Sequence, residues 1–395
     1  MGRAARAVTW GAIALSVACT ALSGVGDLGV GKDGDVPLGD GAVAVLPDGR
    51  VVDARDGGPI LPATDAECGD TSASSEHCGA CGHSCAGGAC RAGMCVPTVL
   101  ASEQARPTDV VAAMGSVYWT VAGLGLNVGS VRALRAGASE VVTLATGEGL
   151  PEQLIHVDGA LYWTNWYSNN TLVRSLVDGG ARTPLVLGQG GGDGVAAGSG
   201  RLYWSLNPFG TTGIHRVLGA LDDGGAIVEY ASDDAGLQYG GPVIGASSVY
   251  WTEERANGRV MRVTVGAAPA AAAPVVIGQG RPRSITTDGA FVYWVADDPL
   301  PSILRVPIAG GPPTRIVGPL PALGRLAVDD TSVYVIDREK SQILRAPKTG
   351  GSPTPIVTAL VSPQSIFVDD RFVYWTTLGP NNGDDAKGTV AKVVK

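Results

Sequence analysis

The stretch Val117-Tyr118-Trp119-Thr120 is the first of seven copies of one short motif. The other copies are Leu161-Tyr162-Trp163-Thr164, Leu202-Tyr203-Trp204-Ser205, Val249-Tyr250-Trp251-Thr252, Val292-Tyr293-Trp294-Val295, Val333-Tyr334-Val335-Ile336 and Val373-Tyr374-Trp375-Thr376. Successive tyrosines lie 44, 41, 47, 43, 41 and 40 residues apart. A period of about forty residues, built from short strand-forming segments, is typical of a β-propeller with one four-stranded blade per repeat. We therefore expect an all-β chain with seven blades.

Each motif lies inside a longer unit that predicts four strands, which we name A to D in chain order. In the fifth repeat, strand A at 285–287 ends in Asp288-Gly289, and the motif that follows is strand B. Asp and Gly tolerate the positive φ of a tight hairpin turn. Strand C at 303–307 and strand D at 314–317 are separated by Gly310-Gly311. Both faces of strand B are apolar, as expected of a strand covered by neighbouring blades on both sides.

The two ends of the repeat region complement each other. The last repeat stops at strand C, residues 389–393, and a spare strand at 97–101 precedes the first repeat. Pairing these two strands closes the ring and leaves only short, protected edges. We predict a seven-bladed propeller over residues 97–395, closed by its N- and C-terminal strands and preceded by a small disulfide-rich module.

The repeats at 98–395 resemble those of the YWTD-type propeller. Two features differ from that family, which has six blades and an Asp after the Thr. Here that position holds other residues, namely Val121, Asn165, Leu206, Glu253 and Thr377. The chain is more broadly similar to bacterial secreted seven-bladed propellers, a superfamily that includes streptogramin-type lyases and gluconolactonase-like enzymes. A fold by itself transfers none of these functions.

Residues 1–19 have the pattern of an export signal. Arg3 and Arg6 precede an apolar run at 7–18, which is too short to span a bilayer. The run ends in Ser16-Val17-Ala18-Cys19, which resembles a bacterial lipobox and predicts lipidation of Cys19. Simple cleavage nearby is the alternative. Removal of Cys19 from the seven cysteines leaves an even six, which favours lipidation.

Residues 20–67 are rich in Gly and Asp, and aromatic residues are absent. Such a composition cannot bury enough apolar surface to offset chain entropy, so we predict a disordered linker. The pairs at Asp33-Gly34-Asp35 and Asp40-Gly41 do not have the spacing of a calcium loop.

Residues 68–96 hold the six remaining cysteines, Cys68, Cys78, Cys81, Cys85, Cys90 and Cys95. A glycine-rich exported segment with too few apolar residues for a core is typically held by disulfides. Zinc is the competing interpretation, because His77 and His83 lie beside the cysteines. The pairing of the cysteines cannot be read from the sequence.

Charge argues against a nucleic-acid partner. The formal net charge is −8, and the arginines Arg281, Arg283 and Arg325 are isolated from one another in the sequence. Binding to phosphate backbones needs a basic footprint. The nucleophile elbow, the zinc-binding His-Glu-x-x-His motif and the P-loop are all absent from the sequence.

Topology indicates where a binding site would lie. In a propeller the B–C and D–A loops emerge on the same face, at the mouth of the central channel. Glu254 lies in one of these loops, and Asp193 precedes a strand A. The residues selected for the candidate binding face are Glu152, Gln153, Trp166, Tyr167, Asp193, Tyr239, Glu253, Arg283, Asp297, Arg325, Asp337 and Gln364. Loops on a rigid scaffold often carry binding residues.

Two functions are compatible with this pattern. The first is a surface-anchored or secreted, non-enzymatic propeller that binds a glycan, peptide or protein at the channel mouth. The second is a secreted hydrolase or lyase in which Glu152 and Asp193 act as acid and base or bind a divalent cation. No catalytic residue and no cofactor is predicted, and calcium binding is left open. We expect a monomer that contacts a membrane only through a lipid anchor.

Overall fold

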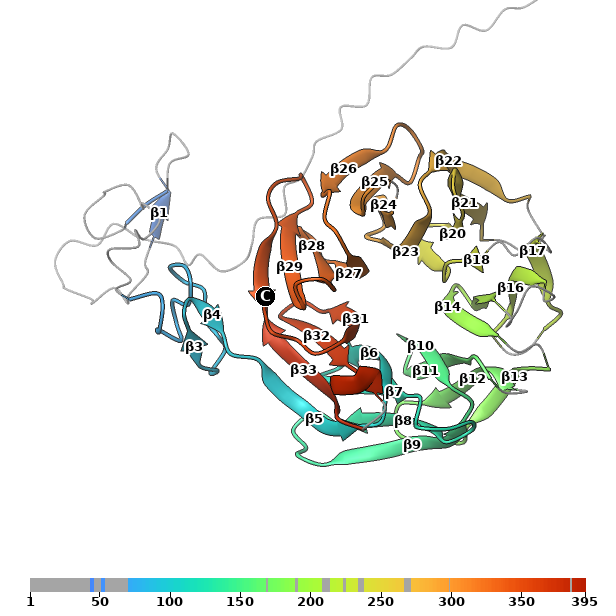
Figure 1. The fold of residues 1–395 in the computed structure, drawn as a ribbon, viewed down its shortest axis with the longest axis horizontal. Coiled ribbons are helices and arrows are strands. Elements are labelled where there is room, and N and C mark those ends of the chain that lie inside the picture. Colours follow the sequence, from blue (N-terminus) through green and yellow to red (C-terminus); the bar gives the residue numbers. More distant parts are fainter. Residues whose placement is uncertain are drawn as a thin grey trace, which may run out of the picture. The chain divides into compact units, whose positions relative to one another are not determined.

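The computed structural model describes residues 70–395, apart from short segments at 168–169, 189–190, 208–213, 223–224, 234–237, 266–270, 298 and 384–385, and it describes the backbone of two short strands further upstream. Those two strands, β1 (Val43–Val45) and β2 (Val51–Asp53), pair with each other inside a separate compact unit at 1–62. The second unit, at 63–395, holds seven four-stranded blades arranged in a ring around a central axis (Figure 1). Cys19, Cys68 and the predicted linker outside β1 and β2 lie beyond the described residues.

The blades follow one another along the chain, each with strand A nearest the axis. Blade 1 consists of β6 (Pro107–Ala113), β7 (Ser116–Val121), β8 (Gly129–Leu134) and β9 (Val141–Glu148). Blade 2 consists of β10 (Pro151–Val157), β11 (Ala160–Asn165), β12 (Asn170–Leu176) and β13 (Thr183–Leu187). Blade 3 consists of β14 (Gly192–Gly198), β15 (Arg201–Leu206), β16 (His215–Leu221) and β17 (Val228–Asp233). Every neighbouring pair within these blades is antiparallel.

Blade 4 differs from the others because its strand A is broken in two. It consists of β18 (Gln238–Tyr239) and β19 (Val243–Gly245), both paired with β20 (Ser248–Glu254), followed by β21 (Gly258–Thr264) and β22 (Ala273–Gln279). Blades 5 and 6 have the regular pattern again. Blade 5 consists of β23 (Pro282–Thr287), β24 (Phe291–Ala296), β25 (Ser302–Pro307) and β26 (Thr314–Val317). Blade 6 consists of β27 (Leu323–Val328), β28 (Ser332–Asp337), β29 (Gln342–Pro347) and β30 (Thr354–Val357).

The predicted closure of the ring is confirmed. Blade 7 consists of β31 (Pro363–Val368), β32 (Phe372–Thr377), β33 (Gly388–Val394) and, from the other end of the domain, β5 (Thr98–Gln104). Val390 pairs with Ala101, and Gly388 pairs with Gln104. A single-turn 3-10 helix, η1 (Pro380–Gly383), lies between β32 and β33. The outer edge of the last blade is therefore covered by the N-terminal strand.

The repeated motif forms the contacts between blades. In each interface the Tyr of one blade and the Trp position of the next belong to one buried hydrophobic cluster. The seven pairs are Tyr118 and Trp163, Tyr162 and Trp204, Tyr203 and Trp251, Tyr250 and Trp294, Tyr293 and Val335, Tyr334 and Trp375, and Tyr374 and Trp119. The six tryptophans are at most 2 % exposed. The alternation along strand B thus presents Tyr to one neighbouring blade and Trp to the other.

The Cys-rich module is cross-linked as predicted. Disulfides join Cys78 to Cys90 and Cys85 to Cys95, and Cys81 is also disulfide-bonded. Cys78, Cys85 and Cys95 lie within ligand distance of one another, but disulfide-bonded sulfurs do not supply the thiolates that zinc requires. Strands β3 (Cys90–Arg91) and β4 (Met94–Cys95) form a small hairpin here. Among the described residues, no helix has the length and apolarity needed to cross a membrane.

The module is attached to the propeller through His83. One ring nitrogen, Nδ1, lies 2.6 Å from the carbonyl oxygen of Cys78, and Nε2 lies 2.8 Å from the carbonyl oxygen of Lys395. The buried cysteines also share a hydrophobic cluster with Tyr334 and Trp375 of blades 6 and 7. The module is therefore packed against the outside of the ring where the chain closes it.

Candidate functional site

The first strands of all seven blades line a central channel of about 780 Å³. Strand A of the regular blades begins at a Pro, Gly or Leu, and the next two residues lie at the end of the channel where the D–A loops enter. In blade 2 these residues are Glu152 and Gln153. The register of β10 on β11 shifts between Pro151 and Leu154. Such bulges re-aim side chains, and the same shift recurs at the start of strand A in all six regular blades.

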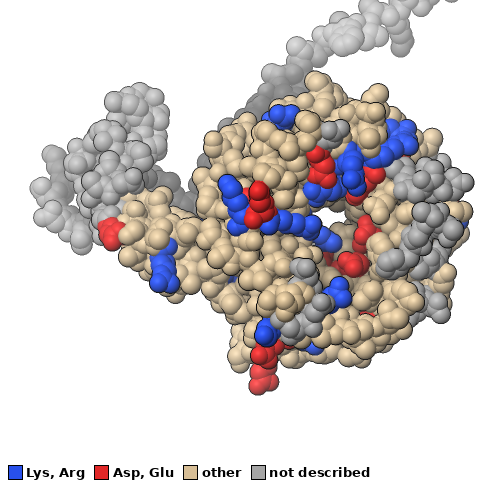
Figure 2. Space-filling view, in the orientation of Figure 1, with Lys and Arg blue, Asp and Glu red and all other residues tan. Residues whose placement is uncertain are grey.

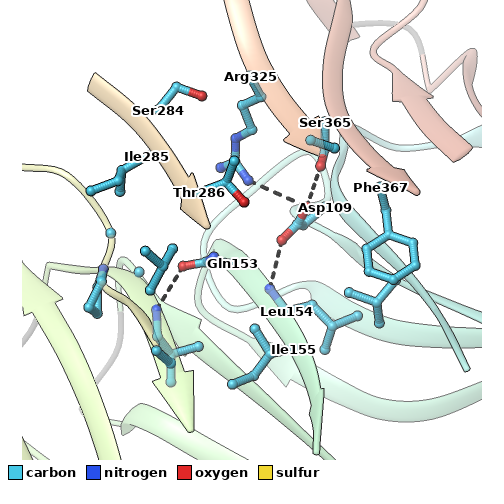
Figure 3. Close-up of a pocket in the computed structure, with 18 of the residues that line it drawn as sticks. Asp109, Gln153, Leu154, Ile155, Ser284, Ile285, Thr286, Arg325, Ser365 and Phe367 are labelled. Atoms are coloured by element: carbon cyan, nitrogen blue, oxygen red, sulfur yellow. Dashed lines mark hydrogen bonds and ion pairs between the residues drawn. The ribbon is translucent and has the colours of Figure 1, made fainter. Parts of the chain in front are cut away.

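Asp109 of blade 1 is the best-connected side chain in this ring. It is buried, and its carboxylate accepts hydrogen bonds from the backbone N–H of Leu154 at 2.9 Å and from the hydroxyl of Ser365. Arg325 of blade 6 places Nη1 3.4 Å from the same carboxylate (Figure 3). Asp109 therefore links blades 1, 2, 6 and 7 across the channel.

Glu152 and Asp193, from blades 2 and 3, face the same space with less compensation. Burial raises the pKa of Glu152 to about 7, opposed by Arg325 and reinforced by the charges of Asp193 and Asp109. Burial also raises the pKa of Asp193, while Arg325 and a 3.1 Å hydrogen bond from Asn207 oppose that rise. Both carboxyl groups are half-buried. The guanidinium of Arg325 interacts electrostatically with both of them and also with Asp109.

Glu254, at the end of β20 in blade 4, is the fourth acid of the mouth. Burial raises its pKa to about 7, and the charge of Asp193 adds to that rise. Arg283 and Arg281 act in the opposite direction. Glu254 lines the channel directly, next to the break between β18 and β19.

Arg283 of blade 5 is already paired. Its guanidinium forms two hydrogen bonds with the carboxylate of Asp297, at 2.6 and 2.8 Å, and a third with the carbonyl oxygen of Leu323 at 2.7 Å. A bidentate pair of this kind is geometrically fixed. The side chain of Arg325 is 36 % exposed, compared with 26 % for that of Arg283.

Charge is therefore distributed unevenly around the channel. Blades 1 to 4 contribute the acids Asp109, Glu152, Asp193 and Glu254, whereas blades 5 and 6 contribute Arg283 and Arg325. Both signs of charge are visible at the edge of the central opening (Figure 2). Because Arg283 is neutralised by Asp297, the acids outnumber the unpaired arginines among these side chains, and the nearby Arg106 and Arg281 offset part of that negative charge.

Below the charged ring the channel wall is largely apolar. Ile155 and Phe367 line it, together with Val111 and Val243 on other blades (Figure 3). Gln153 bridges two blades at the level of the ring, since its side-chain oxygen accepts a 2.8 Å hydrogen bond from the backbone N–H of Val195. Fixed polar groups at the rim of an apolar cavity are a common arrangement in ligand sites.

The structure separates the predicted face residues into two groups. Gln153, Asp193, Arg283 and Arg325 line the channel mouth, Asp297 is paired with Arg283, and Glu152 lies close enough to Arg325, Asp193 and Asp109 to interact with their charges. Gln364 is half-buried at the blade 7 position that corresponds to Glu152. Trp166 and Tyr167 follow β11, and the side chain of Tyr167 is 46 % exposed.

Three predicted residues point into the protein instead. Tyr239 is buried, and its backbone bonds to the side chain of Asn207. Glu253 is 3 % exposed and paired with Arg259 and Arg255, so Glu254 and not Glu253 reaches the channel. Asp337 is 1 % exposed and accepts backbone hydrogen bonds within its own loop.

Asp109, Ser284 and Ser365 line the channel although they were not selected from the sequence. Alignment of the repeats on their tyrosines offers the missing signal. Asp109, Gln153, Ser284, Arg325 and Ser365 each lie nine residues before the Tyr of the motif. This shared position identifies one ring of the channel.

Comparisons with known proteins support the fold alone. No protein-family model matches the sequence, and no curated protein sequence matches it. Among solved structures, the chain is similar to an oligogalacturonate lyase in complex with manganese, with 14% identity, 71% of this chain and 86% of that chain covered, and a TM-score of 0.55. It is also similar to the WD40 β-propeller domain of Doa1, with 12% identity, 76% and 97% coverage and a TM-score of 0.55. A structure of a nidogen/laminin complex matches with 16% identity, 57% and 88% coverage and a TM-score of 0.43.

Proposed function

We propose that this protein is an exported binding protein that takes a peptide, protein or glycan ligand at the mouth of its propeller channel. The observation that carries the proposal is the concentration of charge there. Only 17% of the residues are charged, yet four acids and two arginines from six blades converge on one opening. Burial of charged groups is costly unless they are used or compensated, and Glu152 and Glu254 are only partly compensated.

A ligand screen on the purified protein tests this proposal. Thermal shift and calorimetry with peptides and oligosaccharides would be run on the wild type and on a Glu152→Gln, Glu254→Gln double variant. Glu140 lies exposed in the loop between β8 and β9, so Glu140→Gln provides a control with the same chemical change. We expect ligands whose binding is lost in the double variant and kept in the control. Binding that is unchanged in the double variant would place the site elsewhere.

A second function, secreted hydrolase or lyase, is favoured by one observation. A carboxyl group with a pKa near neutrality, such as that of Glu152, can both donate and accept a proton at physiological pH. Arg325 beside it would stabilise a developing negative charge. Turnover of oligosaccharides, followed by reducing-end and double-bond assays, should disappear in Glu152→Gln if this function is correct. Measurement of bound calcium or manganese distinguishes a metal-assisted version.

Export and anchoring belong to the same proposal. Disulfide bonds indicate an oxidising compartment. The signal at 1–19, lipidation at Cys19 and a bacterial surface location stay proposals, since these residues lie outside the described part. Mass spectrometry of the mature N-terminus decides between them: an acylated Cys19 supports the anchor, and an unmodified N-terminus downstream of Cys19 excludes it.

A further inference from the structure

The corner of the channel between blades 3 and 4 is built differently from the rest of the mouth. Asp193 and Glu254 flank it, close enough for the charge of Asp193 to raise the pKa of Glu254. Its wall is formed by Gly194, Gly240 and Gly241, all of which line the channel. The side chains at this corner are therefore the two carboxylates and Gln153, whose Oε1 would lie 2.8 Å from a Cβ on Gly194 and 3.0 Å from one on Gly241.

The glycines are required by close packing. A Cβ on Gly194 would lie 2.3 Å from the Cα of Gly241, and a Cβ on Gly240 would lie 2.2 Å from the hydroxyl oxygen of Thr252. Real Cβ atoms do not approach other atoms so closely. The missing side chains leave the carboxylate of Glu254 free to approach this wall, since its Oε1 is 3.5 Å from the same Gly240 position.

Thr252 supplies a second, independent sign of a ligand. It is 0 % exposed, and its hydroxyl has no hydrogen-bond partner among the described residues. In four other blades the corresponding hydroxyl forms a hydrogen bond with the backbone of strand A, in its own blade or the next. These hydroxyls belong to Thr120, Thr164, Ser205 and Thr376. Buried polar groups are rarely left unpaired, because each costs about 1–3 kcal/mol.

We propose that this corner binds the ammonium group of a lysine side chain presented by a protein or peptide partner. Asp193 and Glu254 accept hydrogen bonds from the ammonium. Thr252 is a positioning residue: its hydroxyl donates to Glu254 when that carboxylate closes against the Gly240 wall. The inference rests on the proposed binding function and names the chemical group that is recognised.

A lysine fits this corner better than a divalent cation or an arginine. Calcium needs six to eight oxygen ligands, and the corner offers two carboxylates beside the positive charges of Arg281 and Arg283. A guanidinium needs a wide planar site for its five N–H groups, whereas an ammonium is compact and carries three donors.

The loop between β7 and β8 indicates that the lysine belongs to a protein. This B–C loop emerges on the mouth face and carries three exposed apolar side chains, Leu124, Leu126 and Val128, which are 53%, 55% and 57% exposed. Apolar surface on the same face as a charged pocket suits a partner large enough to bury that surface while it inserts one side chain into the pocket. A free amine would leave this surface uncovered.

The inference is tested by selecting displayed peptide loops for binding to the full-length protein. Four libraries of disulfide-constrained loops are used, which are identical except that the central residue is Lys, Arg, Met or Glu. We expect enrichment from the lysine library. Dissociation constants of selected clones should rise about tenfold or more in Glu254→Gln, and about threefold to tenfold in Thr252→Val. Acetylation of the central lysine should abolish binding. Glu140→Gln and Asp330→Asn, two exposed positions, serve as charge controls and should leave the constants unchanged.

Thr252→Val also has a readout that a structural role would not give. The variant removes an unpaired hydroxyl, so its denaturation midpoint should stay equal to or above that of the wild type, whereas Thr376→Val loses a bonded hydroxyl and should be less stable. Weaker lysine binding at unchanged stability supports the positioning role. A Thr252→Val variant that is destabilised would show that the hydroxyl is already used in the fold and would overturn that role.

The remaining outcomes separate this inference from the proposed function. Enrichment from the Arg, Met or Glu library that is lost in Arg325→Gln would keep the channel mouth as a binding site and overturn the lysine specificity. Calcium and manganese are also tested alone. Saturable binding of either ion that competes with a lysine clone and disappears in Glu254→Gln would make the corner a metal site instead. No enrichment from any of the four libraries would count against both proposals.

Discussion

Trp163 and Trp204 hold the same position in adjacent blades and differ in one respect. Both are 0 % exposed. The indole N–H of Trp163 donates to the carboxylate of Glu148 at 2.9 Å, whereas that of Trp204 has no hydrogen-bond partner in the described part of the chain. Replacement of each by Phe removes the same atoms from the same kind of interface. The difference between the two variants therefore isolates the hydrogen bond.

The magnitude follows from the environment of Glu148. This carboxylate is 0 % exposed and also accepts hydrogen bonds from Asn165 and Arg182. A hydrogen bond to a charged group contributes about 1.5–3 kcal/mol. Trp204→Phe loses only packing and also removes an unpaired buried donor, which offsets part of its cost. Trp163→Phe should therefore be less stable than Trp204→Phe by about 2–3 kcal/mol.

Guanidinium denaturation followed by tryptophan fluorescence and far-UV circular dichroism measures both free energies, with equal m-values as the check that the midpoints are comparable. Glu148→Gln keeps an acceptor for the indole and should bring the two tryptophan substitutions closer together. A difference between Trp163→Phe and Trp204→Phe below about 0.5 kcal/mol would refute the reasoning, because ordinary surface substitutions already vary by that amount.

Three further predictions concern the ring, the mouth and the turns. Deletion of residues 1–104 removes β5 and should cause aggregation or a large loss of stability, whereas deletion of 1–62 should leave the melting temperature unchanged. Burial raises the pKa of Glu254 from 4.5 to about 7, so the folded state binds more protons than the unfolded state between those pH values. The free energy of unfolding should therefore fall as the pH rises through this window. Glu254→Gln should flatten the dependence of that free energy on pH, measured by denaturation from pH 5 to 8. Asp329→Asn weakens the ion pair with Lys395 and should lower the free energy of unfolding by about 1–3 kcal/mol at pH 7. Despite its burial, bonding to Lys395 depresses the pKa of Asp329, so the difference between variant and wild type in thermal melts should shrink at acid pH, where the carboxylate is protonated.

The sixth repeat shows that the motif tolerates variation. Val335 occupies the Trp position between blades 5 and 6 and is 1 % exposed. Leu326, Leu344 and Ile316 share its hydrophobic cluster, together with the Tyr of blade 5. Aliphatic side chains from neighbouring strands therefore fill the interface, and the register of the blade is unchanged.

The Asp in the turn between strands A and B also joins neighbouring blades. Asp288, in the turn between strands A and B of blade 5, accepts a 2.8 Å hydrogen bond from the hydroxyl of Tyr293 and one of 2.6 Å from Lys348 of blade 6. These bonds outweigh the effect of burial and lower the pKa of Asp288 to about 2. The turn signal visible in the sequence is thus also a contact between blades.

The sequence by itself determined the number of blades, the closure of the ring and the presence of disulfides. Each of these follows from periodicity or composition, which are local or repeated properties. The period of the motif counts the blades, the unpaired strand at 97–101 matches the missing fourth strand, and the clustered cysteines of a glycine-rich segment predict cross-links.

Only the tertiary structure decided which cysteines pair and which polar side chains meet in the channel. The bulge at the start of strand A changes the alternation of side chains, so adjacent residues such as Arg283 and Ser284 both line the channel. Glu253 and Glu254 are neighbours in the sequence, yet one is buried against Arg259 and the other faces the channel. A shift of one residue in a strand moves a side chain to the opposite face, and register is set by pairing between strands, which the order of residues in one strand does not reveal.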